Sequence, residues 1–386
     1  MSKQIGVALV GYKFMGKAHS NAYHSLKMFF PEVEAEPVMK LLIGRNKEWV
    51  TEAAAQYGWQ GVETDYLAAL KRDDIQLVDI TSPSNAHSWM SIAAAEAGKS
   101  VYCEKPMALS LKDGRAMLKA CEASGVKHMI NFNYRTVPAI ALAKQLIEEG
   151  ALGELFHWRS QYLQDWIVDP DFPLVWRLDK EIAGSGALGD LGAHSIDLAR
   201  WLVGEIKQVV GLDRTFIKQR PIAERMTGLT AQKSDRMGDV TVDDATIFLA
   251  DFENGAVGTF EATRFAPGHK NYNFFEINGS EGSLVFNLER LNELKYYSRK
   301  DKEGLHGFRL IQTTEASHPY VSAWWPPGHI IGWEHTFVHQ VYNLMNAMAR
   351  DEMPLPNFYD GVACQQVLEA VETSCREKQW IAVDQL

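Results

Sequence analysis

The sequence predicts two domains: an α/β domain with a doubly wound parallel sheet, and an α+β domain with a mostly antiparallel, open sheet. Three observations support this prediction. The chain has 386 residues, which is long enough for two domains. Its first third alternates short apolar runs with helical segments, at a spacing typical of parallel strands joined by crossovers. From about Gly153, strand-like segments follow one another with short turns between them.

The first domain, a dinucleotide-binding Rossmann domain, is expected over residues 1–134. Its predicted strands are short and rich in β-branched residues, as strands buried on both faces usually are. Several predicted helices end in Ala-Gly or Ser-Gly or close on a glycine, which is typical of a left-handed helix cap. The predicted strands are 5–10, 37–44, 75–81, 100–106 and 127–133, and the predicted helices are 15–29, 46–58, 85–98 and 111–125.

The second domain, for substrate binding and oligomerisation, is expected over residues 135–357. The sequence Glu253-Asn254-Gly255 predicts a hairpin turn between two of its strands. A last segment, 358–386, is expected to form a C-terminal helix that packs back near the first domain. The predicted strand regions are 154–166, 207–218, 244–265, 271–287 and 292–299, and the predicted late helices are 332–350 and 360–377.

The charge balance argues against nucleic acid as a partner. The chain has 39 Lys and Arg against 49 Asp and Glu, a formal net charge of -10, whereas sequence-independent nucleic-acid binding needs a positive surface. No stretch approaches the roughly 20 apolar residues of a membrane helix, and the N-terminus shows no signal pattern. We therefore expect a cytoplasmic protein that binds neither nucleic acid nor membranes.

The cysteine pattern predicts no metal site. Cys103, Cys121, Cys364 and Cys375 form no C-x-x-C pair and no Cys/His cluster with metal-ligand spacing. Such sparse thiols suit a reducing compartment.

A glycine-containing turn, GYKFMG, follows the first predicted strand. Gly11 and Gly16 stand at the first and third glycine positions of the dinucleotide-binding fingerprint, and Lys13 stands at the second. The first glycine permits a tight turn, the third permits close helix–strand packing, and the helix N-terminus binds phosphate. The Lys13 ammonium could pair with a phosphate. A plain strand–helix turn is the alternative, but an alternating βα context favours dinucleotide binding.

The carboxyl ends of the predicted parallel strands form one polar rim, which is where such sheets bind ligands. His87, at the start of a helix on this rim, has two interpretations: a cofactor contact or a neighbour of the helix cap. The candidate cofactor-binding residues on the rim are Gly11, Lys13, Phe14, Met15, Gly16, Arg45, Asn46, Thr81, Pro83, Asn85, His87, Glu104, Lys105 and Asn133.

The second predicted strand ends without the acid that would bind a ribose 2′-hydroxyl and favour NAD. The sequence there is Gly44-Arg45-Asn46. An arginine at this place suits the 2′-phosphate of NADP, so the residues favour NADP or tolerance of both cofactors. Alternatively, Arg45 stacks on adenine or lies in solvent.

Three stretches carry a family pattern. Residues 11–23 hold the glycine turn, residues 81–114 hold Glu-Lys-Pro after a strand, and residues 184–204 hold a D-x-x-x-H helix. In these stretches the chain resembles the Gfo/Idh/MocA oxidoreductases, the family of glucose–fructose oxidoreductase and inositol dehydrogenase. Residues 161–166 and 324–340 are most similar to levoglucosan dehydrogenase and related sugar or glycoside 3-dehydrogenases.

The predicted catalytic residues are Lys105, Asp190 and His194. The resemblance implies that Lys105 touches both the nicotinamide ribose and the substrate; otherwise it is a surface lysine after a strand. Asp190 and His194 are four apart on a predicted helix, so both project from one face, and the carboxylate supports the imidazole for acid–base work. Either Lys105 or His194 could be the base. Asp197 is either a further partner of His194 or polar surface.

Aromatic, charged and amide side chains that suit a sugar follow in the second domain. Residues 154–166 alternate like a strand, so half of these candidates must face away from a ligand. Residues 324–329, WWPPGH, suit either a carbohydrate subsite or an oligomer contact. The candidate substrate-binding residues are Lys105, Tyr134, Arg135, Tyr162, Asp165, Trp166, Arg177, Asp190 and His194.

The resemblance implies oxidation of a secondary hydroxyl of a sugar, anhydrosugar, glycoside or inositol, with NAD or NADP and with NAD slightly favoured. The alternative is a redox-cycling glycoside hydrolase, in which transient 3-keto oxidation drives elimination without net NADH. A non-catalytic dinucleotide-binding regulator is disfavoured because Lys105, Asp190 and His194 occur together. The resemblance also implies a homodimer or homotetramer formed through the open sheet face.

Overall fold

The chain forms two compact units in the computed structural model, which describes residues 3–227 and 230–385. The first unit comprises Met1–Asn133 and Trp333–Gln365, and the second comprises Tyr134–Gly332 and Gln366–Leu386. The chain therefore returns to the first unit at Trp333. A linear division of the sequence into consecutive domains does not include this return.

The first unit is built on a six-stranded sheet with the order β3-β2-β1-β4-β5-β6. Each neighbouring pair is parallel, which confirms the predicted doubly wound sheet. The three residues of β3 form an additional edge strand that the sequence patterns did not indicate. The strands are β1 (Lys3–Val10), β2 (Ala35–Ile43), β3 (Gly61–Glu63), β4 (Leu77–Ile80), β5 (Ser100–Cys103) and β6 (His128–Ile130).

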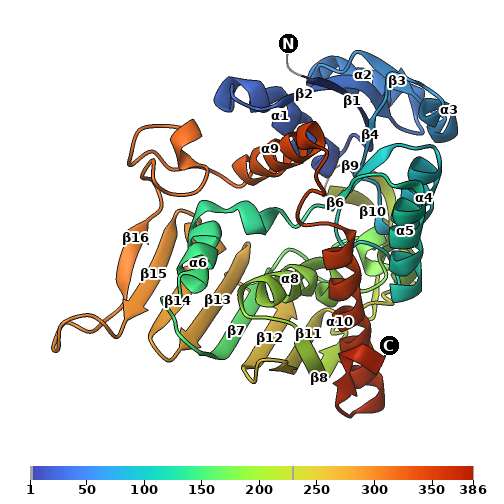
Figure 1. Cartoon of the computed structure of the whole chain (residues 1–386). Helices are drawn as coiled ribbons and strands as arrows, with labels where there is room; N and C mark the ends of the chain where they lie inside the picture. The colour runs from blue at the N-terminus through green and yellow to red at the C-terminus, as the bar shows by residue number, and fades with distance from the viewer. Residues whose placement is uncertain (1–2, 228–229, 386) are drawn as a thin grey trace. The chain divides into compact units, whose positions relative to one another are not determined.

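Helices cover both faces of this sheet: α1 and α9 pack together on one face, and α4 and α5 on the other (Figure 1). The helices α2 and α5 end at Gly58 and Gly125, whose φ angles of 79° and 66° are left-handed, as the glycine-capped ends predicted. The helices of this unit are α1 (Phe14–Phe29), α2 (Lys47–Tyr57), α3 (Tyr66–Leu70), α4 (His87–Glu96), α5 (Leu111–Ser124) and α9 (His335–Arg350).

The second unit is built on a nine-stranded sheet with the order β16-β15-β14-β13-β7-β12-β11-β8-β17. Among the strand pairs of the described residues, only β7 with β12 is parallel in this sheet, so the predicted mostly antiparallel sheet is confirmed. The strands are β7 (Leu155–Leu163), β8 (Ile206–Arg214), β11 (Ala245–Phe252), β12 (Val257–Thr263), β13 (Tyr272–Gly279), β14 (Gly282–Asn287), β15 (Glu293–Ser298), β16 (Arg309–Gln312) and β17 (Ile381–Ala382).

Aromatic side chains form the core on one face of this sheet. Phe248 stacks on Phe260 with ring centroids 4.4 Å apart, and Trp158 stacks on Phe275 at 5.1 Å. The helices α6 (Pro138–Glu148) and α8 (Ala193–Leu202) cover this face (Figure 1). Strand alternation therefore directs the neighbouring residues of β11 to the opposite face.

A separate two-stranded antiparallel sheet, formed by β9 (Gln219–Thr227) and β10 (Thr230–Asp239), was not predicted from the sequence. The sequence of β9 is QRPIAERMT. A proline and several polar residues interrupt the alternation of apolar and polar residues by which a strand is predicted.

The last helix, α10 (Phe358–Glu377), contributes to both units. At its start, the Phe358 N–H donates to His128 Nδ1 (3.1 Å) of the first unit's β6. Near its end, the Ser374 hydroxyl accepts the N–H of Gly211 (3.0 Å) in the second unit's β8. No helix in the part of the chain that the structure describes is long and apolar enough to cross a membrane.

Candidate active site

The candidate cofactor-binding residues lie at one edge of the first unit's sheet. They follow β1, β2, β4, β5 and β6, and the carboxyl ends of parallel neighbours share an edge. The backbone segments of the predicted rim therefore lie at one edge of the sheet. The segments differ in the burial and the hydrogen bonds of their side chains.

The glycine turn brings backbone segments into close approach. Gly11 has a φ of 102°, which favours glycine. A Cβ on Gly16 would lie 2.1 Å from the Gly11 carbonyl oxygen, so only glycine fits there. The helix α1 begins at Phe14, and the side chain of its cap residue, Lys13, makes no capping hydrogen bond. The amide groups of the first turn can thus bind an anion, and this cradle fits a dinucleotide pyrophosphate.

The side chains of the glycine turn differ in their exposure to solvent. Lys13 is exposed beside the helix N-terminus, and Met15 is half-buried. The exposed ring of Phe14 stacks on Trp333, with centroids 5.4 Å apart and an interplanar angle of 10°. This stack joins the turn to the segment that returns to the first unit.

After β2, Arg45 is exposed, whereas Asn46 caps a helix. The Asn46 Oδ1 accepts the Trp49 N–H (3.0 Å) at the start of α2. The Tyr12 ring lies against Gly44, where a Cβ would come within 2.2 Å of the tyrosine Cε1. Asn46 thus has a structural role as a helix cap, and Arg45 is an exposed cation at the carboxyl end of β2.

After β4, Thr81 and His87 are fixed by main-chain carbonyls. The Thr81 hydroxyl donates to the Val10 carbonyl (2.8 Å), which ties this loop to the end of β1. The buried His87 ring has both nitrogens 2.9 Å from carbonyl oxygens, those of Ser82 and Pro106. Burial lowers the pKa of His87. Pro83 and Asn85 are exposed on the same loop.

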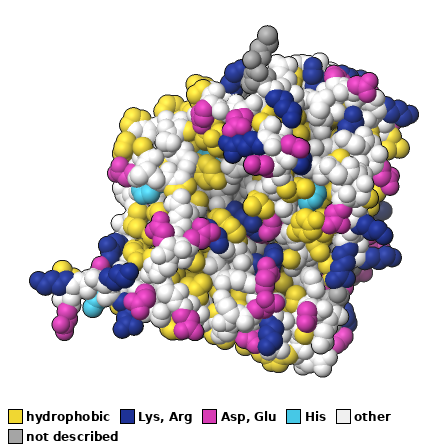
Figure 2. All heavy atoms as spheres, viewed as in Figure 1, with side chains coloured by type: hydrophobic (Ala, Val, Ile, Leu, Met, Phe, Trp, Pro, Cys, Tyr) yellow, Lys and Arg dark blue, Asp and Glu magenta, His cyan; other side chains and the backbone are white. Residues whose placement is uncertain are grey.

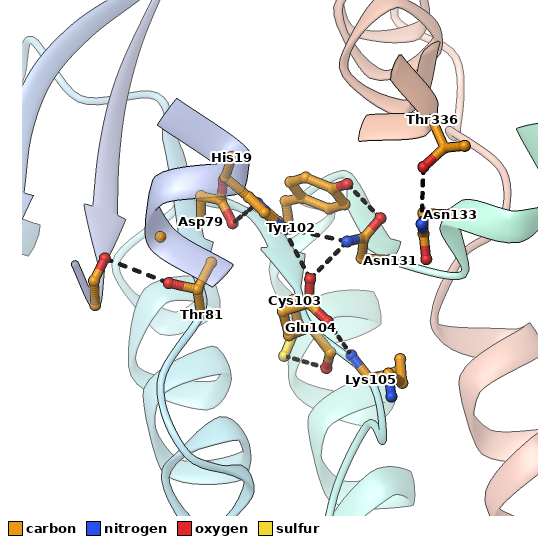
Figure 3. A network of polar contacts seen from close by, with 12 residues as sticks. His19, Asp79, Thr81, Tyr102, Cys103, Glu104, Lys105, Asn131, Asn133 and Thr336 are labelled. Atoms are coloured by element: carbon orange, nitrogen blue, oxygen red, sulfur yellow. Dashed lines mark hydrogen bonds and ion pairs between the residues drawn. The ribbon is translucent and has the colours of Figure 1, made fainter. Parts of the chain in front are cut away.

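After β5, Glu104 is buried and Lys105 is half-buried. The Glu104 Oε1 lies 2.8 Å from His19 Nε2, and its Oε2 accepts the Lys105 backbone N–H at 3.2 Å (Figure 3). Beyond β6, Asn133 Nδ2 donates to the Thr336 hydroxyl (2.8 Å), so α9 orients this asparagine.

In the second unit, Asp190 and His194 stand where helical geometry changes. Residues Leu188–Gly192 form a turn of π-helix, and α8 follows from Ala193. The four-residue spacing therefore does not have the α-helical geometry that the sequence suggested. Asp190 accepts a hydrogen bond from the nearly fully buried Arg264, with Nη2 to Oδ2 at 2.8 Å.

The loop before this turn is ordered by Asp243. Its Oδ1 accepts the N–H of Gly186 (2.6 Å), and its Oδ2 accepts the N–H of Leu188 (2.8 Å). A Cβ on Gly186 would lie 1.8 Å from the Asp243 carbonyl oxygen. The glycine-rich sequence is needed because the loop packs backbone on backbone.

Two tyrosines hold the buried His194 ring. The centroid of Tyr134 lies 4.4 Å from that of His194, and the centroid of Tyr162 lies at 6.0 Å. The two phenol oxygens are 2.9 Å apart. Burial, assisted by Tyr134 and the Asp190 charge, raises the pKa of Tyr162 well above its ordinary value, so this phenol stays protonated.

A chain of contacts continues from Tyr162 towards Asp190. The Tyr162 hydroxyl donates to Asn271 Oδ1 (2.8 Å), and Gln164 Nε2 donates to the same oxygen (2.8 Å). The Trp166 Nε1 donates to Gln164 Oε1 (2.9 Å), and the Arg264 guanidinium lies 5.5 Å from the Trp166 ring. The structure thus brings Tyr134, Tyr162, Trp166, Asp190 and His194 into one connected group.

Three other predicted substrate residues have partners outside this connected group. Asp165 pairs with the exposed Lys270 (2.7 Å), and the Arg177 guanidinium lies 4.4 Å from the Trp176 ring. Arg135 is buried and forms a bidentate ion pair with Asp197, at 2.9 and 2.5 Å. Asp197 is therefore no surface residue, and its pairing favours a structural role for Arg135.

The sequence patterns did not indicate a role for five further residues: His19, Asp79, Asn131, Arg264 and Trp333. Asp79 had a usable signal, because a carboxylate within the apolar strand LVDI needs a buried partner. Arg264 gave no comparable signal, since a single arginine after a strand is most often exposed.

Two family models match this chain, one in each unit. Residues 5–132 match the model of an oxidoreductase family with an NAD-binding Rossmann fold. Residues 140–285 match a GFO/IDH/MocA C-terminal domain.

Several full-length relatives are similar to this chain. Levoglucosan dehydrogenase of Pseudarthrobacter phenanthrenivorans is 42% identical over 100% of this chain and 99% of its own length. The structure of a levoglucosan dehydrogenase in complex with NADH and levoglucosan matches with a TM-score of 0.94 and 42% identity, over 99% of this chain and 100% of that chain. An oxidoreductase domain protein from Kribbella flavida matches with a TM-score of 0.94 and 48% identity over the same shares.

Proposed function

Because the chain belongs to the GFO/IDH/MocA family of NAD-binding oxidoreductases, we propose that it is an NAD-dependent dehydrogenase of a secondary hydroxyl in a sugar or anhydrosugar. The observation that carries the proposal is the placement of Lys105. This half-buried lysine follows β5 at the same sheet edge as the glycine turn after β1, which is where the sheet binds a dinucleotide.

The residues of the glycine turn and of the loops after β2 and β4 are proposed to hold the cofactor. The turn at Gly11 and Gly16 admits the pyrophosphate, and Lys13 adds a positive charge beside it. Arg45 is the exposed residue proposed to face the adenosine ribose. When bound, the nicotinamide supplies the hydride acceptor.

The proposed chemistry divides between two groups. His194 takes the proton from the substrate hydroxyl oxygen, and Lys105 stabilises that oxygen with its ammonium group. Tyr134 and Tyr162 fix the orientation of the His194 ring through their contacts with it. Asp190, held by Arg264, is proposed to support the imidazolium after the proton is taken.

Levoglucosan is the first substrate to test. The similar levoglucosan dehydrogenase, whose structure is a complex with NADH and levoglucosan, covers 99% of this chain. Trp166, Gln164 and Asn271 form the aromatic and amide surface that we assign to the sugar, because aromatic faces pack on sugar rings and amides bind hydroxyl groups.

We further propose that the chain acts in the cytoplasm as a homodimer or homotetramer. The side chains of Ile247 and Leu249 on β11 are 51% and 47% exposed on the uncovered face of the second sheet. Leu212 lies opposite Ile247 in the neighbouring strand and is also exposed. A row of exposed apolar residues on one face of a sheet favours burial of that face against a second copy. Light scattering at micromolar concentration should give a multiple of the monomer mass; a monomer mass would contradict self-association.

The function is tested by a panel of sugars, anhydrosugars and inositols, each with NAD⁺ and with NADP⁺, followed by the absorbance of the reduced cofactor. Substitution of His194 by Ala should lower kcat on the order of a hundredfold and remove the low-pH limb of the oxidation rate. Substitution of Lys105 by Met should lower turnover and weaken cofactor binding. If Lys105→Met loses the limb while His194→Ala keeps it, the two roles are exchanged; if neither slows turnover, the assignment is wrong.

A further inference from the structure

A cluster of buried charges lies directly behind Lys105 in the first unit. His19 projects from α1, Asp79 belongs to β4, and Glu104 follows β5 (Figure 3). The His19 Nδ1 lies 2.8 Å from Asp79 Oδ2, and its Nε2 lies 2.8 Å from Glu104 Oε1. None of the three residues is more than 4% exposed. With both acids ionised, a ring that has a carboxylate at each nitrogen needs a hydrogen on both, which makes His19 an imidazolium. The Asn131 amide nitrogen, 3.1 Å from His19 Nε2, then donates to Glu104 Oε1 and not to the ring.

Both oxygens of Glu104 are engaged. Oε1 faces His19 and also accepts a hydrogen bond from Asn131 Nδ2 (2.6 Å), while Oε2 accepts the Lys105 backbone N–H (3.2 Å). The Glu104 carboxylate therefore links the histidine to the main chain of the lysine. A side chain held at both oxygens has little freedom to rotate.

The far side of His19 is equally well fixed. Asp79 Oδ2 accepts the Tyr23 hydroxyl (2.8 Å) as well as the ring nitrogen. The Tyr102 and Phe337 rings lie 5.1 and 5.4 Å from the imidazole, and the Tyr102 hydroxyl donates to Asn131 (2.7 Å). Burial alone would lower the pKa of His19, but the Asp79 and Glu104 carboxylates outweigh it and raise the pKa to about 10.

We infer that His19 is a positioning residue for the reaction: its imidazolium, clamped between Asp79 and Glu104, fixes the Glu104 carboxylate that holds the backbone of Lys105. The inference rests on the proposed function, because His19 affects turnover only through the catalytic role proposed for Lys105. A neutral side chain at position 19 leaves two buried carboxylates without the cation between them. They then repel each other, Glu104 shifts or takes up a proton, and its hold on Lys105 loosens.

The test is steady-state kinetics of His19→Gln with NAD⁺ and levoglucosan, beside Glu104→Gln and the double variant. We expect His19→Gln to lower kcat about tenfold or more, because small displacements of a catalytic group are costly. The KM for levoglucosan should change less than kcat. Because both residues act through one contact, the double variant should be no slower than Glu104→Gln alone.

The matched control is His128→Gln. His128 is also a buried histidine of the first unit, but its Nδ1 accepts the Phe358 N–H, and burial lowers its pKa to about 4, so it is neutral. Its replacement should lower thermal stability while changing kcat by less than about twofold. If His19→Gln does not fold, the double variant replaces it, since it removes the ion pair and keeps the net charge of the cluster.

Three results would overturn the inference. His19→Gln could fold and keep wild-type kcat, it could lose kcat only to the extent that His128→Gln does, or the double variant could show the product of the two single effects. A failure of the proposed function is distinguishable from these results, because Lys105→Met would then leave turnover unchanged.

Discussion

Arg264 donates a hydrogen bond from Nη2 to Asp190 Oδ2 at 2.8 Å, and the arginine is nearly fully buried. Its other contacts, to the carbonyls of Gly186 and Arg177, anchor the guanidinium to the loops around the π-turn. Arg264 thus fixes the orientation of the Asp190 carboxylate.

We predict that Arg264→Gln lowers kcat on the order of tenfold, because Asp190 loses its fixed partner. The control is Arg290→Gln, which breaks an exposed ion pair with Glu293 in the same unit and should leave kcat near the wild-type value. Equal rates for Arg264→Gln and the wild type would show that Asp190 does not depend on this contact.

Lys13 should contribute to the affinity for the cofactor and not to kcat at saturating cofactor. The lysine is exposed beside an α1 N-terminus that no side chain caps. Lys13→Gln is expected to weaken NADH binding about tenfold, the scale of a charge-assisted hydrogen bond. Fluorescence titration measures this affinity. Lys17→Gln, one turn further along the exposed side of α1, serves as the control. Equal affinity of the two variants would place Lys13 away from the phosphates.

Arg45 should affect the choice between the two nicotinamide cofactors. It is exposed at the carboxyl end of β2, and an acid there would bind the ribose hydroxyls of NAD while repelling the phosphate of NADP. Arg45→Asp is expected to raise the ratio of kcat/KM for NAD⁺ over NADP⁺ about tenfold or more. Lys47→Asp makes the same change in charge at the start of α2. A ratio that moves equally in both variants would reflect general charge and not a ribose contact.

Two of the buried histidines of the first unit, His19 and His128, should give opposite pH dependences of stability. The carboxylates around His19 raise its pKa from 6.5 to about 10, so its contribution is full below pH 6.5 and is lost as the pH rises towards 10. Burial lowers the pKa of His128 to about 4, so its contribution is lost as the pH falls from 6.5 towards 4.

Urea unfolding across pH 5–10 measures these contributions. For His19→Gln we expect the alkaline decline in the free energy of unfolding to shrink by on the order of a few kcal/mol. For His128→Gln the acid decline should shrink instead. An alkaline decline that is identical in the wild type and His19→Gln would show that His19 is neutral in the folded protein.

Local patterns were sufficient to predict the sheet and the cofactor rim. Alternating strands and helices place the ends of β1, β4 and β5 at one edge whatever the side chains do, and glycines such as Gly58 end helices by their own backbone preference. The return of the chain at Trp333 was not predictable in this way. It depends on packing between α9 and α1, which are more than 300 residues apart in the sequence.

The arrangement of charged partners also depends on long-range contacts. His19 and Glu104 are separated by 85 residues, and Arg264 and Asp190 by 74. Spacing along the chain indicated Asp190 and His194 as a pair, but a π-turn changes their helical geometry. On the face shown in Figure 2, acidic and basic side chains are interspersed, which agrees with the absence of a strongly basic composition.

The proposed function requires net hydride transfer from a sugar to NAD⁺. The most direct measurement quantifies NADH and the oxidised sugar in the same reaction, with levoglucosan as substrate and His194→Ala as the inactive control. We predict that the wild type forms the two products in equimolar amounts and that His194→Ala forms little of either. Net hydride transfer would be contradicted if a sugar product accumulated without NADH, as a redox-cycling glycoside hydrolase would give with a glycoside. It would also be contradicted if no sugar of the panel gave NADH.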